Sequence, residues 1–167
     1  MNRARWQVSN QFILPNNYPL HNCAAGILRS YQLGLQSGNL VAASWAQLHS
    51  ILYPYLMGKR LGDILGRIRQ NVSQMEDFKQ AEQALLTRMI WQLMLNLSGQ
   101  SIDPTKLTSE VVYCETFVPE RSAQQGFVEL IKLELYVFFS DYELAAELAL
   151  VDRGALRKAH RDISRND

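Results

Sequence analysis

Residues Leu28 to Tyr55 read LRSYQLGLQSGNLVAASWAQLHSILYPY, and the expected architecture of the whole chain follows from them. It predicts two helices joined at Ser37-Gly38-Asn39, because glycine and asparagine tolerate the left-handed backbone that ends a helix. Asn39 is also a good N-cap for the second helix, since its side chain can accept a bond from an unpaired backbone N–H. Small residues crowd the expected crossing of the two helices and would let their backbones approach closely: Gly34, Ala42, Ala43, Ser44 and Ala46.

Two such helices cannot bury their apolar faces alone, so further helices must pack beside them. The sequence therefore predicts an all-α fold, a tetratricopeptide-like stack of antiparallel helix pairs that forms an α-solenoid. By apolar spacing the chain has expected helical segments at 20–36, 40–57, 60–75, 77–97, 104–111, 124–139 and 142–152. Residues 112–122 are expected to form a loop.

Internal sequence similarity supports the idea of a repeat. Gly38-Asn39-Leu40 resembles Ser140-Asp141-Tyr142, because in both places a small residue and a capping residue lead into a helix. Asn39 and Asp141 are separated by three times the tetratricopeptide period of about 34 residues. This similarity suggests that a common helix-pair unit recurs along the chain.

Residues 133–139 leave two interpretations open. Alternation and the β-branched and aromatic content of LELYVFF are compatible with a strand. The length of the apolar segment and the stripe Phe127, Leu130, Ile131, Leu135 and Phe138 favour a helix.

Other residues predict local features of the helices. Pro54 is expected to kink the second helix or to end it early. Gly62 and Gly66 share one helical face, which predicts close packing against a partner helix. Asp63 and Arg67 are four residues apart and are expected to form an ion pair on the outer face of their helix.

Length and composition place the chain among ordinary globular proteins. It has 167 residues, of which 47% are apolar and 20% charged, with a net charge of +1. This charge favours neither nucleic acid nor a membrane surface as a partner. We expect an irregular lead-in over 1–19, one helical-repeat domain over 20–153 and a basic, frayed tail over 154–167.

The sequence predicts a cytoplasmic protein. The N-terminus lacks the apolar run of a secretory signal, and no window approaches the roughly 20 apolar residues of a membrane span. Cys23 and Cys114 are far apart in the sequence and are expected to be reduced thiols.

No catalytic, cofactor-binding or metal-binding residues are expected. His21 and Cys23 offer two metal ligands, but no second pair follows at the spacing of a zinc site. Glycine-rich phosphate loops and kinase signatures are absent from the sequence. Basic residues of the third helix and the turn before it are interpreted as a solvated face: Lys59, Arg60, Arg67 and Arg69.

Three aromatic side chains are candidates for lining a groove or pocket between helices: Trp45, Tyr53 and Trp91. The same residue types at helical spacing are also typical of inter-helix packing, so both interpretations stay open.

Several runs of the sequence occur in an order that resembles a known helical region. They are Pro19-Leu20-His21, Ser30 to Asn39 (SYQLGLQSGN), Gly58 to Leu61 (GKRL), Leu93 to Gly99 (LMLNLSG), Asp103 to Glu110 (DPTKLTSE) and Phe139 to Glu147 (FSDYELAAE). The region belongs to large signalling proteins that carry a predicted AAA-type ATPase, often fused to a kinase, histidine-kinase or cyclase output. The resemblance extends over roughly 19–150.

In that family the region is a tetratricopeptide-like stack between the nucleotide-binding module and the output domain. The resemblance therefore implies a sensing, coupling or scaffolding role in signal transduction, with ATPase or kinase modules as possible protein partners. The sequence contains neither of those modules, so it implies no ATP hydrolysis and no kinase activity here.

These observations lead to one main hypothesis and two alternatives. The main hypothesis is a non-enzymatic helical-repeat module that binds a protein partner in a groove between stacked helices. The first alternative is a small-molecule sensor with a pocket lined by Trp45, Tyr53 and Trp91. The second is an all-α enzyme, which clustering of His49 with carboxylates in a cleft would favour.

Overall fold

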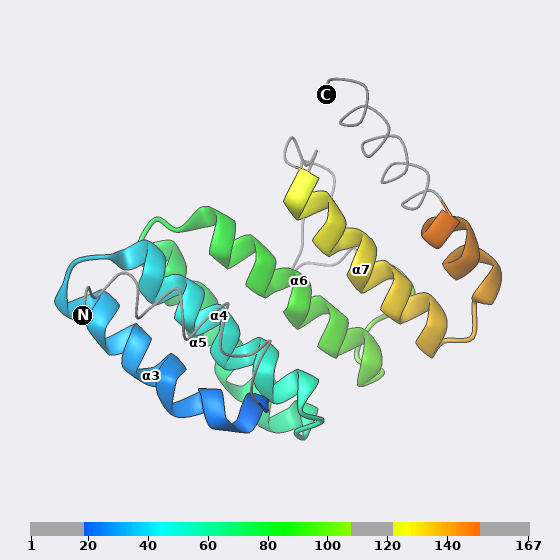
Figure 1. Ribbon diagram of the computed structural model, residues 1–167. Coiled ribbons are helices and arrows are strands. Elements are labelled where there is room, and N and C mark those ends of the chain that lie inside the picture. The colour runs from blue at the N-terminus through cyan, green and yellow to red at the C-terminus, as the bar shows by residue number, and fades with distance from the viewer. Residues whose placement is uncertain (1–18, 108–121, 151–167) are drawn as a thin grey trace, which may run out of the picture. The chain divides into compact units, whose positions relative to one another are not determined.

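The computed structural model describes residues 19–107 and 122–150. Every regular element in these residues is a helix and none is a strand (Figure 1), which confirms the all-α class. Leu133 lies well inside α7 (Ser122–Phe138), so the helical interpretation of that segment is confirmed and the strand is wrong. The chain divides into two compact units, Met1–Met94 and Leu95–Asp167, and the division falls inside α6 (Ala81–Leu97).

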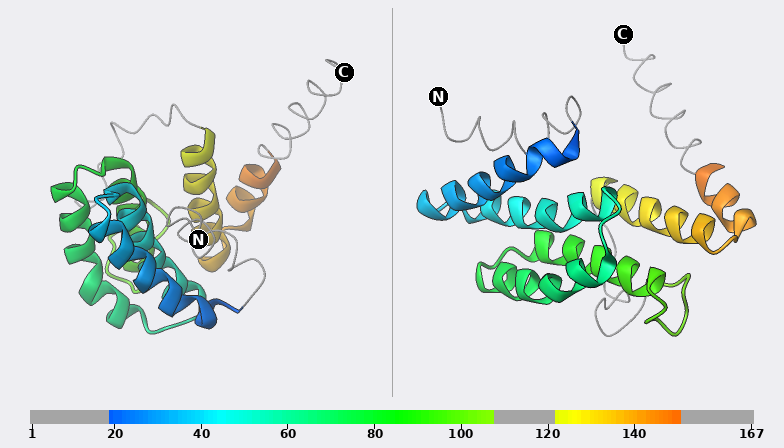
Figure 2. Two further views of the ribbon diagram at one scale, coloured as in Figure 1. Left: turned by 60° about the vertical axis from the view of Figure 1, so that its left-hand side comes forward. Right: turned by 90° about the horizontal axis from the view of Figure 1, so that it is seen from below.

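The first unit contains α3 (Leu20–Gln36), α4 (Leu40–Leu56), α5 (Leu61–Asp77) and most of α6. These helices run back and forth beside one another (Figure 2), with α3 packed on α4 and α4 on α5. Each helix is 17 residues long. One helix pair follows the other after 41 residues, from Leu20 to Leu61 and from Leu40 to Ala81. This advance is longer than the tetratricopeptide period of about 34 residues.

Three side-chain contacts join α5 to α6 within this unit. Arg88 donates a hydrogen bond to Glu76 across the surface. The buried Thr87 hydroxyl lies 3.4 Å from the Met75 sulfur. The Arg69 guanidinium sits 5.7 Å from the centroid of the Trp91 ring. The two helices are therefore held at both their interior and their surface.

The turn between α3 and α4 forms as the sequence predicts. Gly38 has a φ of 70°, and the Asn39 side chain accepts a bond of 3.1 Å from the Ala42 N–H. Gly58 and Gly99 end α4 and α6 with the same left-handed conformation. In the α4 ending, the N–H of Lys59 reaches back to the Pro54 carbonyl at 3.0 Å and satisfies it.

The start of α6 was predicted wrongly. The expected helix began at 77, but Asp77 is the last residue of α5 and α6 begins at Ala81. Between them Lys79 takes a φ of 57°, and the Gln80 N–H bonds to the Met75 carbonyl at 2.8 Å. A lysine therefore occupies a helix-ending position that glycine usually fills.

The structure also tests the predictions made for Pro54 and for the segment 104–111. Pro54 does not end α4, which continues to Leu56. Residues 104 and 105 form a turn and residues 106 and 107 have no regular structure, so the expected helical turns do not begin there. The rest of that segment, most of the loop over 112–122, and nearly all of the lead-in and the tail lie outside the described residues.

The core of the first unit is centred on α4, which packs against both α3 and α5. The small-residue crossing of α3 and α4 is confirmed, since Gly34 is buried against Ala43. Gly62 and Gly66 are exposed with no atom near their missing Cβ, so the close packing predicted for them is wrong. The largest apolar side chains that are buried almost completely in the unit are Ile51, Ile64, Ile68, Met75, Met89, Ile90 and Met94.

The second unit contains α7 and a helix that begins at residue 142 and is described to residue 150. One face of α7 is buried through Val128, Ile131 and Leu135. Before the described part of the chain breaks at 107, the fully buried Asn96 amide donates to the carbonyls of Pro104 at 3.0 Å and Lys106 at 2.7 Å. This side chain ties the segment after α6 back to its own helix.

Candidate functional site

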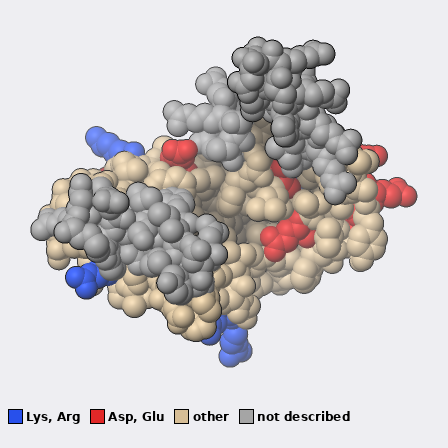
Figure 3. All heavy atoms as spheres, viewed as in Figure 1, with Lys and Arg blue, Asp and Glu red and all other residues tan. Residues whose placement is uncertain are grey.

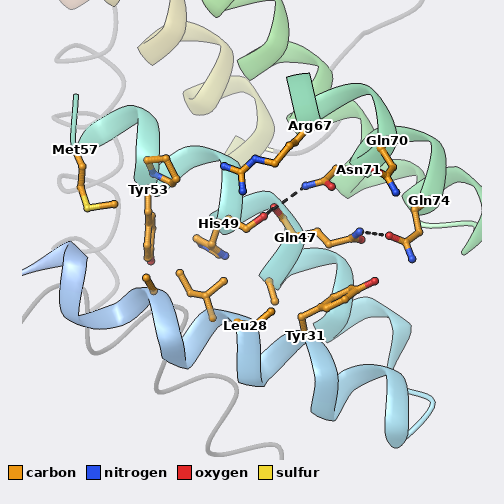
Figure 4. A pocket seen from close by; sticks show the side chains of 15 residues that line it. Leu28, Tyr31, Gln47, His49, Tyr53, Met57, Arg67, Gln70, Asn71 and Gln74 are labelled. Atoms are coloured by element: carbon orange, nitrogen blue, oxygen red, sulfur yellow. Dashed lines mark hydrogen bonds between the residues drawn. The ribbon is translucent and has the colours of Figure 1, made fainter. Parts of the chain in front are cut away.

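A groove of about 450 Å³ opens between α3, α4 and α5, entirely within the first unit (Figure 4). Its two walls, from α3 and α5, and its floor, from α4, differ in chemistry because the three helices place different residue types along the groove. The residues that line it are Ala24, Ile27, Leu28, Tyr31, Ala46, Gln47, His49, Ser50, Tyr53, Pro54, Met57, Arg67, Gln70, Asn71 and Gln74.

The wall supplied by α3 is apolar. Ile27 is buried beneath it, whereas Leu28 keeps 60% of its surface exposed and Tyr31 is half-buried. The end of α4 extends this surface with Tyr53 and Met57, on the left in Figure 4. An exposed leucine beside aromatic and thioether side chains offers an apolar ligand a contact surface that is already formed.

The wall supplied by α5 is polar. Arg67, Gln70, Asn71 and Gln74 recur every three or four residues and so share one face of the helix, which Figure 4 shows turned toward the groove. Together they present one guanidinium and three amide side chains to a ligand. Across the whole visible face in Figure 3, by contrast, the Lys and Arg side chains that are drawn in colour stand apart and form no continuous patch.

The floor of the groove contains a buried amide pair. Gln47, with 6% of its surface exposed, donates from Nε2 to Gln74 Oε1 at 2.6 Å. Its own Oε1 is buried and accepts no hydrogen bond from the described residues. A buried carbonyl oxygen without a donor costs about 1–3 kcal/mol, so a ligand that brought an N–H group to it would recover that energy.

His49 is also part of the floor but is not arranged as a base. The ring is 6% exposed, and its Nδ1 lies 2.7 Å from the Trp45 carbonyl one helical turn earlier. Burial lowers the pKa of His49, an effect that the bond to Trp45 only partly opposes. The ring packs against Tyr53 with 5.1 Å between centroids. Burial, followed by the neighbouring Cys23, raises the pKa of the Tyr53 hydroxyl to about 12.

The three aromatic candidates lie in different places. Tyr53 lines the groove. Trp45 and Trp91 are not among the groove residues. The Trp45 ring is tilted against the His49 ring with 6.1 Å between centroids, and the Trp91 ring lies beneath Arg69. Gln47, Asn71 and Gln74 were not among the residues predicted from the sequence. For Asn71 and Gln74 the available signal is the polar row on α5, which looks like a solvated face until its neighbours are known. For Gln47 it is an amide within the apolar run of α4.

Within residues 19–107 and 122–150, no group of three or more His, Cys, Asp and Glu side chains is placed to hold a metal ion. Cys23 is buried, with its sulfur 3.8 Å from the Pro19 carbonyl. In the same part of the chain, no helix has both the length and the apolar character needed to cross a membrane.

The second unit contains a smaller hollow of about 230 Å³ beside α7. It is lined by Gly126, Glu129, Leu130, Leu133, Leu148 and Ala149. Its described lining offers a single polar side chain, the Glu129 carboxylate, so it has less to recognise a ligand with than the groove of the first unit.

Comparison of the sequence with protein-family models and curated proteins, and of the structure with solved structures, finds no match.

Proposed function

We propose that the chain is a non-catalytic helical-repeat interaction module that binds a segment of a partner protein in the groove between α3, α4 and α5. One observation supports this function most directly. The exposed Leu28 and the half-buried Tyr31 face a row of amide donors and a guanidinium on α5, so the groove can hold apolar side chains and polar main chain together. In this proposal the helices of the first unit are a tetratricopeptide-like scaffold with a longer pair period.

The resemblance drawn from the sequence adds a biological setting to the proposal. It favours a coupling or scaffolding role in signalling, with ATPase or kinase modules as the first partners to test. The groove chemistry itself asks only for an accessible polypeptide segment.

The experiment compares two leucines of nearly equal exposure. Leu28 in the groove is 60% exposed, and Leu56 at the end of α4, outside the groove, is 58% exposed. Affinity purification from the native cell is carried out with the unaltered chain, Leu28→Gln and Leu56→Gln, and read by mass spectrometry. We expect proteins that bind in the groove to be captured by the chain and by Leu56→Gln but lost with Leu28→Gln.

Thermal melting of both variants serves as the folding control, because an exposed leucine contributes little to the core. If Leu28→Gln captures the same partners as the unaltered chain while both variants melt normally, the groove is not the binding surface and the proposal is wrong.

A small-molecule sensor is the second candidate, and the volume of the groove is the observation that favours it. About 450 Å³ falls within the range of roughly 300–1,000 Å³ that is typical of small-ligand pockets. A metabolite that binds there would raise the melting temperature of the chain and not that of Leu28→Gln. A thermal-shift screen without any such compound, together with partner loss in Leu28→Gln, would favour the interaction module.

A further inference from the structure

The groove contains a single charged side chain among its described lining residues, the guanidinium of Arg67. No aspartate or glutamate lines it, and burial lowers the pKa of His49 on its floor, which disfavours the charged ring. The ion pair that the sequence predicts between Asp63 and Arg67 is not present. Arg67 is exposed and comes within ion-pair distance of none of the described carboxylates. Its position therefore favours a ligand with a negative charge.

Gln47 requires a different group from the ligand, a hydrogen-bond donor. Its Nε2 is engaged by Gln74, so the Oε1 atom is the part of this amide that still needs a donor. Gln47 lines the groove and its Oε1 is buried, so a donor that arrives through the groove pairs with this oxygen once the amide turns toward it. A ligand that fits both groups must carry an anion and an N–H group.

The two groups are set apart along α5. Gln47 is hydrogen-bonded to Gln74, and Gln74 is seven residues from Arg67, which corresponds to about 10 Å along the helix. An extended chain covers this distance in about three residues. A polypeptide segment supplies main-chain N–H groups at that interval, a carboxylate, and apolar side chains for the wall around Leu28. A fatty acid supplies the carboxylate and the apolar part but has no N–H.

We propose that the groove recognises an extended acidic–apolar segment, with a carboxylate bound to Arg67 and a main-chain N–H about three residues away donated to Gln47 Oε1. This inference rests on the interaction function proposed above and specifies its partner. The carboxylate is the side chain of an Asp or Glu, or the C-terminal carboxyl group, and the two sources are separated by experiment.

The test uses the full chain and pools of acetylated octapeptides with apolar and neutral residues at the variable positions. One amidated pool has a central glutamate, a second a central glutamine and a third a central lysine. A fourth has the central glutamine and a free C-terminal carboxyl group. We expect binding of the glutamate pool, or of the free-carboxyl pool, to be about tenfold tighter than that of the amidated glutamine pool. Which of the two pools is preferred identifies the source of the carboxylate.

Arg67→Gln and Arg69→Gln form a matched pair for this measurement. Both remove one guanidinium from α5, but Arg69 lies over Trp91 and does not line the groove. We expect Arg67→Gln to abolish the preference for the acidic pool and Arg69→Gln to retain it.

Gln47→Met tests the N–H donor. It replaces the amide with an apolar side chain of similar length, so we expect it to weaken binding of every pool several-fold without lowering the melting temperature. A merely structural role for Gln47 predicts a lower melting temperature with unchanged relative binding, and that result would overturn the assignment. Decanoate is the second probe, and binding of decanoate as tight as that of the acidic pool would also overturn it.

The outcomes separate this inference from the function on which it rests. If all pools bind equally and Arg67→Gln changes nothing, the carboxylate assignment is wrong while the interaction module stands. If no pool binds while Leu28→Gln still loses the partners that the unaltered chain captures, the acidic segment is wrong and the interaction module stands. If no pool binds and Leu28→Gln loses no partner, both proposals fail.

Discussion

Gly34 of α3 lies against Ala43 of α4 so closely that a Cβ on Gly34 would fall 2.8 Å from the Ala43 nitrogen and 2.9 Å from the Ala43 Cβ. The contact includes backbone atoms, which cannot turn aside as a flexible side chain can. We therefore expect Gly34→Ala to push α3 and α4 apart and to lower the free energy of unfolding by about 1–3 kcal/mol. Urea unfolding of the variant measures this, and an unchanged midpoint would contradict it.

Gly66→Ala is the matched control and is predicted to have the opposite sign. Gly66 lies inside α5 with open space where its Cβ would be. Alanine is the better helix former there, so we expect the free energy of unfolding to rise by about 1 kcal/mol. The same urea experiment reads the change, and a loss of stability would mean that this face of α5 is covered in solution.

His49 makes stability depend on pH near neutrality. Burial lowers the pKa of the folded ring below its ordinary value of 6.5. As the pH falls through 6.5 the unfolded chain takes up a proton and the folded chain does not, so stability is full above this pH and declines below it. We expect the urea midpoint to fall between about pH 7.5 and pH 6, and the change to be smaller in His49→Gln. An equal change in both proteins would assign the effect to other groups.

Asn96 is predicted to hold the segment after α6 in place. Its side chain donates to two carbonyls, and Asn96→Ala removes both bonds at a cost of about 1–3 kcal/mol. We expect faster amide hydrogen exchange in residues 101–107 and little change in α3. Ser98→Ala, at an exposed position near the end of the same helix, should leave that exchange as it is. Equal protection in Asn96→Ala would show that other contacts hold the segment.

Much of the first helix pair follows from local rules. Gly38 and Asn39 specify their turn through backbone freedom and capping, and the small residues of α3 and α4 mark a crossing that the structure confirms. The end of α5 could not be predicted in this way. Lys79 takes the left-handed conformation because the surrounding helices require a turn there, and nothing in a lysine indicates it.

Gly34 of α3 and Gly66 of α5 show that a glycine within a helix can have different causes. Both lie inside helices, but of the two only Gly34 meets the backbone of another helix. Helical spacing shows which residues share a face and does not show which face is covered.

The groove was the hardest feature to predict for the same reason. Tyr53 stands out by its chemistry, whereas Asn71 and Gln74 resemble any solvated helix face. They line the groove only because α4 places α5 within reach of α3. Burial of Gln47 could have been predicted, because it lies within an apolar run of α4, and a buried amide needs a hydrogen-bond partner.

The uniform length of the helices limits how a chain of this kind can change in size. Because α3 to α6 all have 17 residues and each pair follows after 41, duplication of a whole pair would present a new α5-like face to the next helix. Insertion of one residue inside a helix would instead turn everything beyond it by about 100° and bring polar side chains into the interior. Growth by whole pairs is thus accommodated, whereas a single-residue insertion within a helix would destabilise the packing of every helix beyond it.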